Sequence, residues 1–266
     1  MPNTSQILLE RVARFRLRRH HLLDEPPADA VTICRDICGV QAQVMSAAYL
    51  QLWTRNHAIT REAVESALWR TRTLVKTSLM RQTLHFVPTD EFHLYISALR
   101  PSRYAQAMRV MARCGISRAE SEALIPRIMD ILSAGPLSRP AIAAAIRPKA
   151  RKRVRFWMEN SWSLVRLPVA EGLVCYGKGE GNAIVFIRAD HWLPNLKPGL
   201  MSATEAQCSL LRKYLRAYGP ATLTDFSHWA GIPMQAVKTL RPLFEAELLS
   251  QEDAQRICPL VKYLDH

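Results

Sequence analysis

The chain has 266 residues, 48% of them hydrophobic, and its 36 Lys and Arg against 23 Asp and Glu give a formal net charge of +13. This composition is typical of a globular protein and excludes fibrous and disordered classes. No apolar run reaches the roughly 18 residues of a membrane helix, so a soluble cytoplasmic protein is expected. The excess of positive charge favours a polyanionic partner.

The first segment is arginine-rich and predicts a helix rather than a transit peptide, since it lacks an apolar core followed by a small-residue cleavage site. Apolar residues at helical spacing are expected to form its packed face: Ile7, Leu8, Val12 and Phe15. Arginines recur along one face of the same helix: Arg11, Arg14 and Arg18. His20 and His21 follow it and are interpreted as helix-terminal residues rather than ligands.

Two glutamines flank a single alanine in the stretch GVQAQ, residues 39–43. In an extended segment, residues i and i+2 point to the same side, so Gln41 and Gln43 are expected to face one small space. The methyl group of Ala42 then turns toward the protein. Read alone, the pair is most simply solvated surface, because glutamine usually is.

A weak internal repeat of a hydroxyl residue followed four positions later by a large apolar residue organises the rest of the chain. Its copies pair Thr60 with Val64, Ser138 with Ile142 and Thr222 with Phe226, and Gly-Pro precedes the last two. The pattern predicts a turn, a helix N-cap and a core anchor.

The second copy lies within a recognisable unit. A helix over residues 120–133 precedes it, with an apolar stripe of Leu124, Ile128, Ile131 and Leu132. A further helix over 156–167 follows, and residues 173–194 predict two strands around a Gly-rich turn at 177–182. The turn lacks the spacing of a phosphate-binding loop, and no helix opens after it. Helix, turn, helix, helix and hairpin is the order of a winged helix.

A second basic run, RPKARKRVR, spans residues 147–155 without an acidic residue. Each run alone suits a solvated face, but two such runs in a chain of this charge favour contacts with nucleic-acid phosphates.

The six cysteines are scattered, and only Cys34 and Cys38 lie one helical turn apart. Because no matching Cys or His pair follows, no metal site is expected, and buried free thiols in a reducing cytoplasm are favoured. Four tryptophans at helical spacing are expected in the core: Trp53, Trp69, Trp157 and Trp162.

Three segments together resemble the AlkZ/YcaQ family: GVQAQ at 39–43, LVKTSLMRQTLHFVP at 74–88 and YGPATLTDFSHWAGIP at 218–233. Members of that family are bacterial DNA glycosylases built from tandem winged helices. They act on N-alkylated purines, and some act on interstrand crosslinks. The similarity runs from the first helix to about residue 250.

The resemblance implies a catalytic role for two residues. In the family a glutamine, an aliphatic residue and then glutamine or aspartate form the catalytic motif, which Gln41, Ala42 and Gln43 match here. Two amides suit this chemistry, because an N7- or N3-alkylated purine leaves without a proton and only the water needs positioning. No cofactor or metal is implied.

The expected DNA-binding residues fall in the family-like segment 74–88 and in the second basic run: Lys76, Arg81, His85, Arg151, Lys152 and Arg153. A strand through residues 78–86 would place Arg81, Thr83 and His85 on one face. A structural role for Arg81 and His85 is the alternative, and their place in the family-like segment favours DNA.

The sequence therefore predicts a mostly α protein with short β-hairpins (α+β), built from tandem winged-helix modules. The modules are expected at 1–116, with the glutamine motif, at 117–198, and at 199–266, the last incomplete because no strand pair follows a helix over 232–249. The expected protein is a monomeric, monofunctional glycosylase acting on double-stranded DNA. The alternatives are a non-catalytic DNA-binding regulator, a truncated family member with weakened activity, and a degenerate protein that binds nucleic acid indiscriminately.

Overall fold

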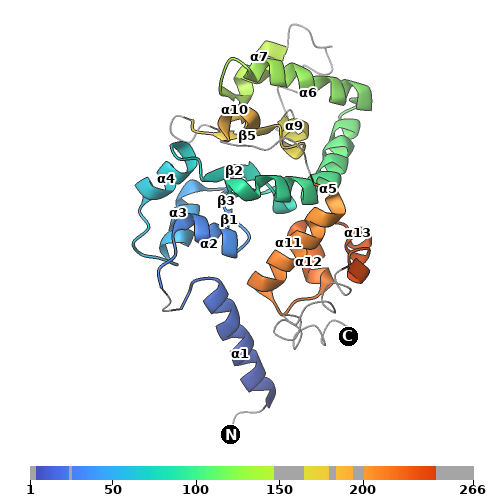
Figure 1. Cartoon of the computed structure of the whole chain (residues 1–266). Helices are drawn as coiled ribbons and strands as arrows, with labels where there is room; N and C mark the ends of the chain where they lie inside the picture. Colours follow the sequence, from blue (N-terminus) through green and yellow to red (C-terminus); the bar gives the residue numbers. More distant parts are fainter. Residues whose placement is uncertain (1–3, 24–25, 147–164, 180–183, 194–200, 244–266) are drawn as a thin grey trace.

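The structure is a computed structural model that describes residues 4–23, 26–146, 165–179, 184–193 and 201–243 (Figure 1). Helices dominate the described residues, and the strands form one small antiparallel sheet. The helices are α1 (Thr4–Arg19), α2 (Ala30–Asp36), α3 (Met45–Trp53), α4 (Arg61–Trp69), α5 (Phe92–Arg113), α6 (Arg118–Leu132), α7 (Arg139–Ile146), α9 (Arg166–Ala170), α10 (Ala189–Trp192), α11 (Ala203–Tyr218), α12 (Leu223–Ala230) and α13 (Met234–Lys238). The 3₁₀ turns are η1 (Met80–Gln82) and η2 (Thr89–Glu91). None of these helices is both long and apolar enough to cross a bilayer.

The sheet joins two hairpins that are about a hundred residues apart in sequence. Its strands are β1 (Val40–Gln41), β2 (Leu74–Ser78), β3 (Leu84–Pro88), β4 (Leu137–Ser138), β5 (Val174–Gly177) and β6 (Val185–Arg188), in the spatial order β1-β3-β2-β5-β6-β4. The hairpin expected over residues 173–194 is confirmed as β5 and β6. The pairing of Lys76 with Tyr176 connects it to β2.

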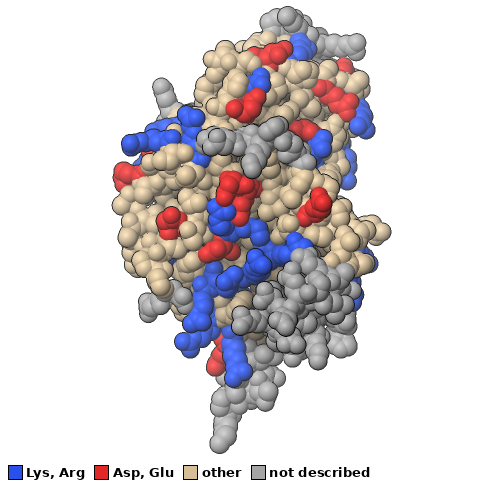
Figure 2. Space-filling model, viewed as in Figure 1, with Lys and Arg blue, Asp and Glu red and all other residues tan. Residues whose placement is uncertain are grey.

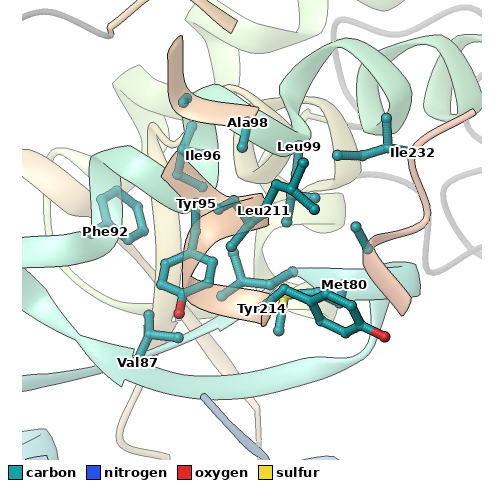
Figure 3. Close-up of a cluster of buried hydrophobic side chains, with 14 of the residues drawn as sticks. Met80, Val87, Phe92, Tyr95, Ile96, Ala98, Leu99, Leu211, Tyr214 and Ile232 are labelled. Atoms are coloured by element: carbon teal, nitrogen blue, oxygen red, sulfur yellow. The ribbon is translucent and has the colours of Figure 1, made fainter. Parts of the chain in front are cut away.

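Buried hydrophobic residues of the described chain form three clusters. One lies among α2, α3, α4 and the strands β1 to β3, and includes Ile33, Leu52 and Phe86. A second lies among the later half of α5, α6, α7 and the strands β5 and β6. The third joins α5 to α11 and α12, where Tyr95 and Leu211 pack together (Figure 3). The long helix α5 thus contributes to two of the three clusters and links them.

The predicted turn, cap and anchor repeat is confirmed at all three copies. Thr60 and Thr222 cap α4 and α12 by accepting hydrogen bonds from the backbone N–H groups three residues on. Ser138 Oγ accepts one from the Ala141 N–H at 3.4 Å. The three anchors are buried: Val64, Ile142 and Phe226. Local capping chemistry alone determines this pattern, which explains why it could be read from sequence.

The first helix is confirmed, but its expected packed face is confirmed only in part: Val12 is half-buried, whereas Phe15 is not buried. Phe15 is 38% exposed, and the side chains of residues 4–8 lie outside the described set. Basic groups hold α1 instead: Arg16 Nη2 donates to the Pro220 carbonyl at 2.8 Å and Arg19 Nε to that of Arg216 at 2.9 Å. Cations stabilise the negative end of a helix, which here is the carboxyl end of α11. His20, just past α1, also contacts this end through the Ala217 carbonyl at 3.1 Å.

A strand through residues 78–86 is wrong. The chain turns between β2 and β3, and Arg81 and Gln82 both have positive φ, +50° and +63°. Helix α12 packs closely against this turn and stabilises it. A Cβ on Gly231, at the end of α12, would lie only 3.2 Å from the Arg81 backbone nitrogen. The alternation that placed Arg81 and His85 on one face therefore does not hold.

The expected burial of the tryptophans and cysteines is confirmed only in part, and the last expected helix is interrupted. Trp53 is 46% exposed and stacks on His57 with ring centroids 4.5 Å apart, so its expected core position is wrong. Trp69 is half-buried and packs against the first cluster. Of the free cysteines, Cys114 is exposed, and four are buried: Cys34, Cys38, Cys175 and Cys208. The helix expected over 232–249 is interrupted after Lys238.

In the stripe of the helix at 120–133, three residues are buried and Ile131 is half-buried. Residues 156–164 of the helix expected over 156–167 lie outside the described residues, as do Trp157, Trp162 and Cys258.

Candidate active site

The glutamine motif lies at the edge of the sheet, where β1 pairs with β3. Val40 stands opposite Phe86, and Gln41 opposite His85. Val40 and Ala42 are fully buried, whereas Gln41 and Gln43 are exposed. The expected alternation is confirmed: the alanine methyl packs inward and both glutamines lie on the open side.

Gly39 makes this close pairing possible. Its φ is +98°, and a Cβ at this position would lie 2.9 Å from Val87 Cγ1 and 3.1 Å from the Phe86 carbonyl oxygen. A side chain here would therefore push β1 away from β3. The glycine that precedes the motif sets the position of both glutamines.

The Gln43 side chain is held by the backbone of β3. Its Oε1 accepts a hydrogen bond from the Leu84 N–H at 3.2 Å, and the Ala42 N–H donates to the Leu84 carbonyl at 2.6 Å. The amide thereby takes the place of a backbone acceptor at the end of the ladder. Because the Leu84 N–H needs an acceptor, it is the oxygen of the Gln43 amide, not the nitrogen, that faces Leu84.

Gln41 is held differently. Its backbone carbonyl accepts a hydrogen bond from Gln51 Nε2 at 3.0 Å, which ties the motif to α3. Its side chain shares a side of the β1 and β3 pair with His85, since the two residues are directly opposite.

A cleft of about 690 Å³ opens beside Gln43. Residues from α3, α4, β2 and the hairpin of β5 and β6 line it, among them Tyr49, Trp69, Lys76 and Tyr176. Gln41 is not among its lining residues. Of the two expected catalytic residues, Gln43 is the one that borders this space.

Lys76 lies in the wall of the cleft and is 9% exposed. Its Nζ approaches Met45 Sδ at 3.1 Å, and burial lowers the pKa of its ammonium group. Lys76 therefore borders the cleft rather than the outer surface of the protein.

The lining of the cleft also includes a charged cluster that the sequence did not reveal. Glu65 Oε1 accepts from Arg61 Nε at 2.8 Å and from the Tyr49 hydroxyl at 3.3 Å, and its Oε2 lies 3.9 Å from Lys178 Nζ. The Arg61 hydrogen bond lowers the pKa of Glu65. The spacing of Arg61 and Glu65 after the Thr60 cap was the available signal, but it is equally typical of any exposed helix.

Arg81 and His85 lie in different surroundings. Arg81 is exposed and borders a separate hollow of about 360 Å³ with Arg16, Tyr218 and Trp229. His85 is 5% exposed, and burial lowers its pKa to about 4. Its Nδ1 donates to the Thr83 carbonyl at 2.9 Å, so the neutral ring presents Nε2 as an acceptor.

Basic side chains gather on part of the face seen in Figure 2. Figure 2 shows Lys and Arg side chains gathered in a band over α1 and the adjoining part of α11, and Arg11, Arg14 and Arg18 are exposed there. The expected DNA-binding residues Arg151, Lys152 and Arg153 lie outside the described residues.

Comparison with known proteins agrees with this architecture. Residues 34–256 match the family model described as DNA glycosylase AlkZ-like. The chain therefore belongs to the AlkZ-like DNA glycosylase family, as the resemblance implied. It is 28% identical over 240 residues to the interstrand DNA cross-link repair glycosylase of Streptomyces sahachiroi, covering 88% of this chain and 63% of that protein.

The solved structure of Streptomyces sahachiroi DNA glycosylase AlkZ superposes with a TM-score of 0.78 at 26% identity. The match covers 88% of this chain and 64% of that one. The chain thus spans somewhat less than two thirds of the length of these relatives.

Proposed function

We propose that the protein is a monofunctional DNA glycosylase that hydrolyses the N-glycosidic bond of N7- or N3-alkylated purines in double-stranded DNA. The observation that carries the proposal is the Gln43 amide, which is fixed by the Leu84 N–H at the edge of a large cleft. Membership of the AlkZ-like family supports the same reaction. The Streptomyces sahachiroi relative is named for interstrand cross-link repair, and we extend the proposal to such crosslinks.

In the proposed reaction the bond between C1′ and the purine nitrogen breaks, and its electron pair neutralises the cationic base. A water oxygen forms the new bond to C1′ and releases a proton to solvent. Amide oxygens of Gln41 and Gln43 accept hydrogen bonds from this water and hold it in line, which supplies position and dipole rather than strong basicity. Such a site suits labile cationic lesions.

The cleft has features suited to a purine turned out of the duplex. Its walls present the aromatic side chains of Tyr49, Trp69 and Tyr176, and cations are attracted to aromatic faces. Glu65 adds a carboxylate whose pKa is lowered, so it stays negative near neutral pH. Lys76 is then placed to meet a phosphate of the same nucleotide.

The proposal includes three tandem winged-helix modules at 1–116, 117–198 and 199–266. The order α2, α3, α4, β2 and β3 supports the first, and α6, α7, β5 and β6 support the second. Each has its own buried cluster. In the third, α11, α12 and α13 supply the helices. The protein is proposed to work as a monomer in the cytoplasm, where free buried thiols are stable.

A base-release assay on duplex DNA carrying N7-methylguanine tests this function. The native chain is expected to release free N7-methylguanine. Gln41→Ala and Gln43→Ala should each remove most of this activity and leave duplex affinity nearly unchanged, since the pair acts at one nucleotide rather than along the backbone. A chain that binds the duplex without releasing base would instead be a non-catalytic DNA-binding protein.

A further inference from the structure

A third, smaller cavity of about 110 Å³ lies between α5, α9, β5 and the turn that joins β2 to β3. A water molecule needs roughly 10–15 Å³ of such space, so the cavity has room for a small polyatomic ligand. Its polar lining consists of Ser78, Gln82, Arg103, Arg166 and Tyr176. No Asp or Glu is among its described lining residues, so the charge facing it is positive.

Arg103 is the unusual member of this lining. It is 7% exposed, and its Nε and Nη1 are buried without a hydrogen-bond partner in the described part of the chain. Burial lowers its pKa to about 10, so the guanidinium remains charged at neutral pH. A buried charge is normally paired and hydrogen-bonded, so a guanidinium that borders a cavity with two N–H groups lacking partners among the described residues indicates room for an anionic ligand.

A second guanidinium is held in place at the same cavity. Arg166 Nη1 donates to Gln82 Oε1 at 2.8 Å. Gln82 is set by the left-handed turn, where φ is +50° at Arg81 and +63° at Gln82. Two successive non-glycine residues in this region are strained, and such strain concentrates at binding sites. The Arg166 contact fixes the orientation of the Gln82 amide, whose Nε2 N–H groups can donate to a ligand.

We propose that the cavity between Arg103 and Arg166 binds a phosphate group. The two guanidinium groups, the Gln82 amide, the Ser78 hydroxyl and the Tyr176 hydroxyl supply donors around a space of the right size. Arginine matches phosphate oxygens with paired N–H groups, and the buried surroundings strengthen each contact. The phosphate supplies an anionic partner for Arg103, whose Nε and Nη1 have none among the residues that the structure describes.

The cavity adjoins the cleft beside Gln43. Tyr176 lines both this cavity and the cleft beside Gln43, so a bound phosphate lies one side chain away from the cleft. The group is therefore either a backbone phosphate of bound DNA or free inorganic phosphate. Binding of a phosphate group does not depend on the proposed hydrolysis and is measured without it.

Calorimetric titration of the full chain with inorganic phosphate, at fixed ionic strength in a non-coordinating buffer, tests the proposal. One phosphate per chain is expected to bind. Arg103→Met and Arg166→Gln should each weaken binding at least tenfold. Arg109→Gln removes the same charge from an exposed position on α5 and should leave binding unchanged. Arg166 is only half-buried, so its variant keeps the test valid if Arg103→Met does not fold.

Repeating the titration with the chain saturated by unmodified duplex DNA distinguishes the two sources. If a backbone phosphate occupies the cavity, the duplex blocks phosphate binding and Arg166→Gln weakens duplex affinity more than Arg109→Gln does. If free phosphate is the ligand, it binds equally well with the duplex present. Absence of phosphate binding by the native chain, or equal effects of Arg109→Gln and Arg166→Gln, would overturn the proposal.

Discussion

Gln43 Oε1 accepts a hydrogen bond from the Leu84 N–H at 3.2 Å, so the side chain completes the backbone ladder between β1 and β3. A side chain held in this way has one amide orientation rather than two. Its remaining acceptor capacity is then available to a water in the cleft. The same contact links the stability of the sheet edge to the proposed chemistry.

Loss of the hydrogen bond between Gln43 and Leu84 should lower the free energy of unfolding. Gln43→Ala leaves the Leu84 N–H without its side-chain acceptor, and water can replace it only in part because Leu84 is 6% exposed. A decrease of about 1 kcal/mol in the free energy of unfolding is expected. Urea denaturation measures it, with Gln106→Ala on the exposed side of α5 as the control. Equal stability of the two variants would mean that the hydrogen bond is not formed.

Gly39 should tolerate alanine poorly. Its φ of +98° and the 2.9 Å approach to Val87 Cγ1 impose both backbone strain and a steric clash. Gly135 is a matched control, because its φ is +137° and nothing lies within 4 Å of an added Cβ. Gly39→Ala should therefore destabilise by roughly 1–3 kcal/mol more than Gly135→Ala. Thermal unfolding of the two variants compares them, and equal losses would show that β1 does not pack closely on β3.

Stability should depend on pH through His85. Burial is the main cause of its pKa of about 4, with a smaller contribution from the positive charges of Arg81 and Arg103. The unfolded chain binds this proton near pH 6.5 and the folded chain does not, so stability is full above pH 6.5 and falls as the pH drops toward 4. The resulting decrease in the free energy of unfolding between neutral pH and pH 4 is about 3 kcal/mol. His85→Gln should lose this dependence in denaturation measured from pH 7 to 4, and an unchanged pH dependence would contradict the burial of His85.

DNA binding should depend strongly on salt. If about six to ten phosphates are neutralised, the logarithm of the binding constant should fall against that of salt with a slope of roughly −5 to −9. Neutralising Arg151, Lys152 and Arg153 together should reduce the slope by about three. Fluorescence anisotropy of a labelled duplex measures both quantities. A flat response would exclude the electrostatic interpretation, and an unchanged slope in the triple variant would make that run a solvated loop.

Features determined by neighbouring residues were predictable from the sequence. The caps at Thr60 and Thr222, the hairpin of β5 and β6, and the inward methyl of Ala42 all follow from local rules and are confirmed. The catalytic roles of Gln41 and Gln43 came from family resemblance and stay predictions. The cleft is formed by segments far apart in the chain, so no local pattern revealed it.

Features determined by tertiary packing were missed. Arg81 and Gln82 adopt positive φ without a glycine, because the packing of α12 through Gly231 stabilises the turn. The prediction that Phe15 packs against the protein was wrong, because Arg16 attaches α1 to the Pro220 carbonyl and Phe15 stays exposed. Lys76 and Tyr176 pair across about a hundred residues of sequence, which no local pattern predicts. The sequence therefore could not show that Tyr176 lines both the cleft beside Gln43 and the cavity at Arg103.

The most direct test of the proposed reaction is the single-turnover rate of N7-methylguanine release by Gln43→Asp, measured beside Gln43→Ala, Gln106→Ala and the native chain. Removing the amide should slow release about a hundredfold, or ~2.7 kcal/mol in the barrier. Aspartate, which the family accepts at this position, should keep or exceed the native rate, because a carboxylate binds the water more strongly and stabilises positive charge at C1′. Gln106→Ala should match the native chain. If the native chain releases no base, or if Gln43→Asp is as inactive as Gln43→Ala while circular dichroism shows both folded, water positioning by Gln43 is wrong.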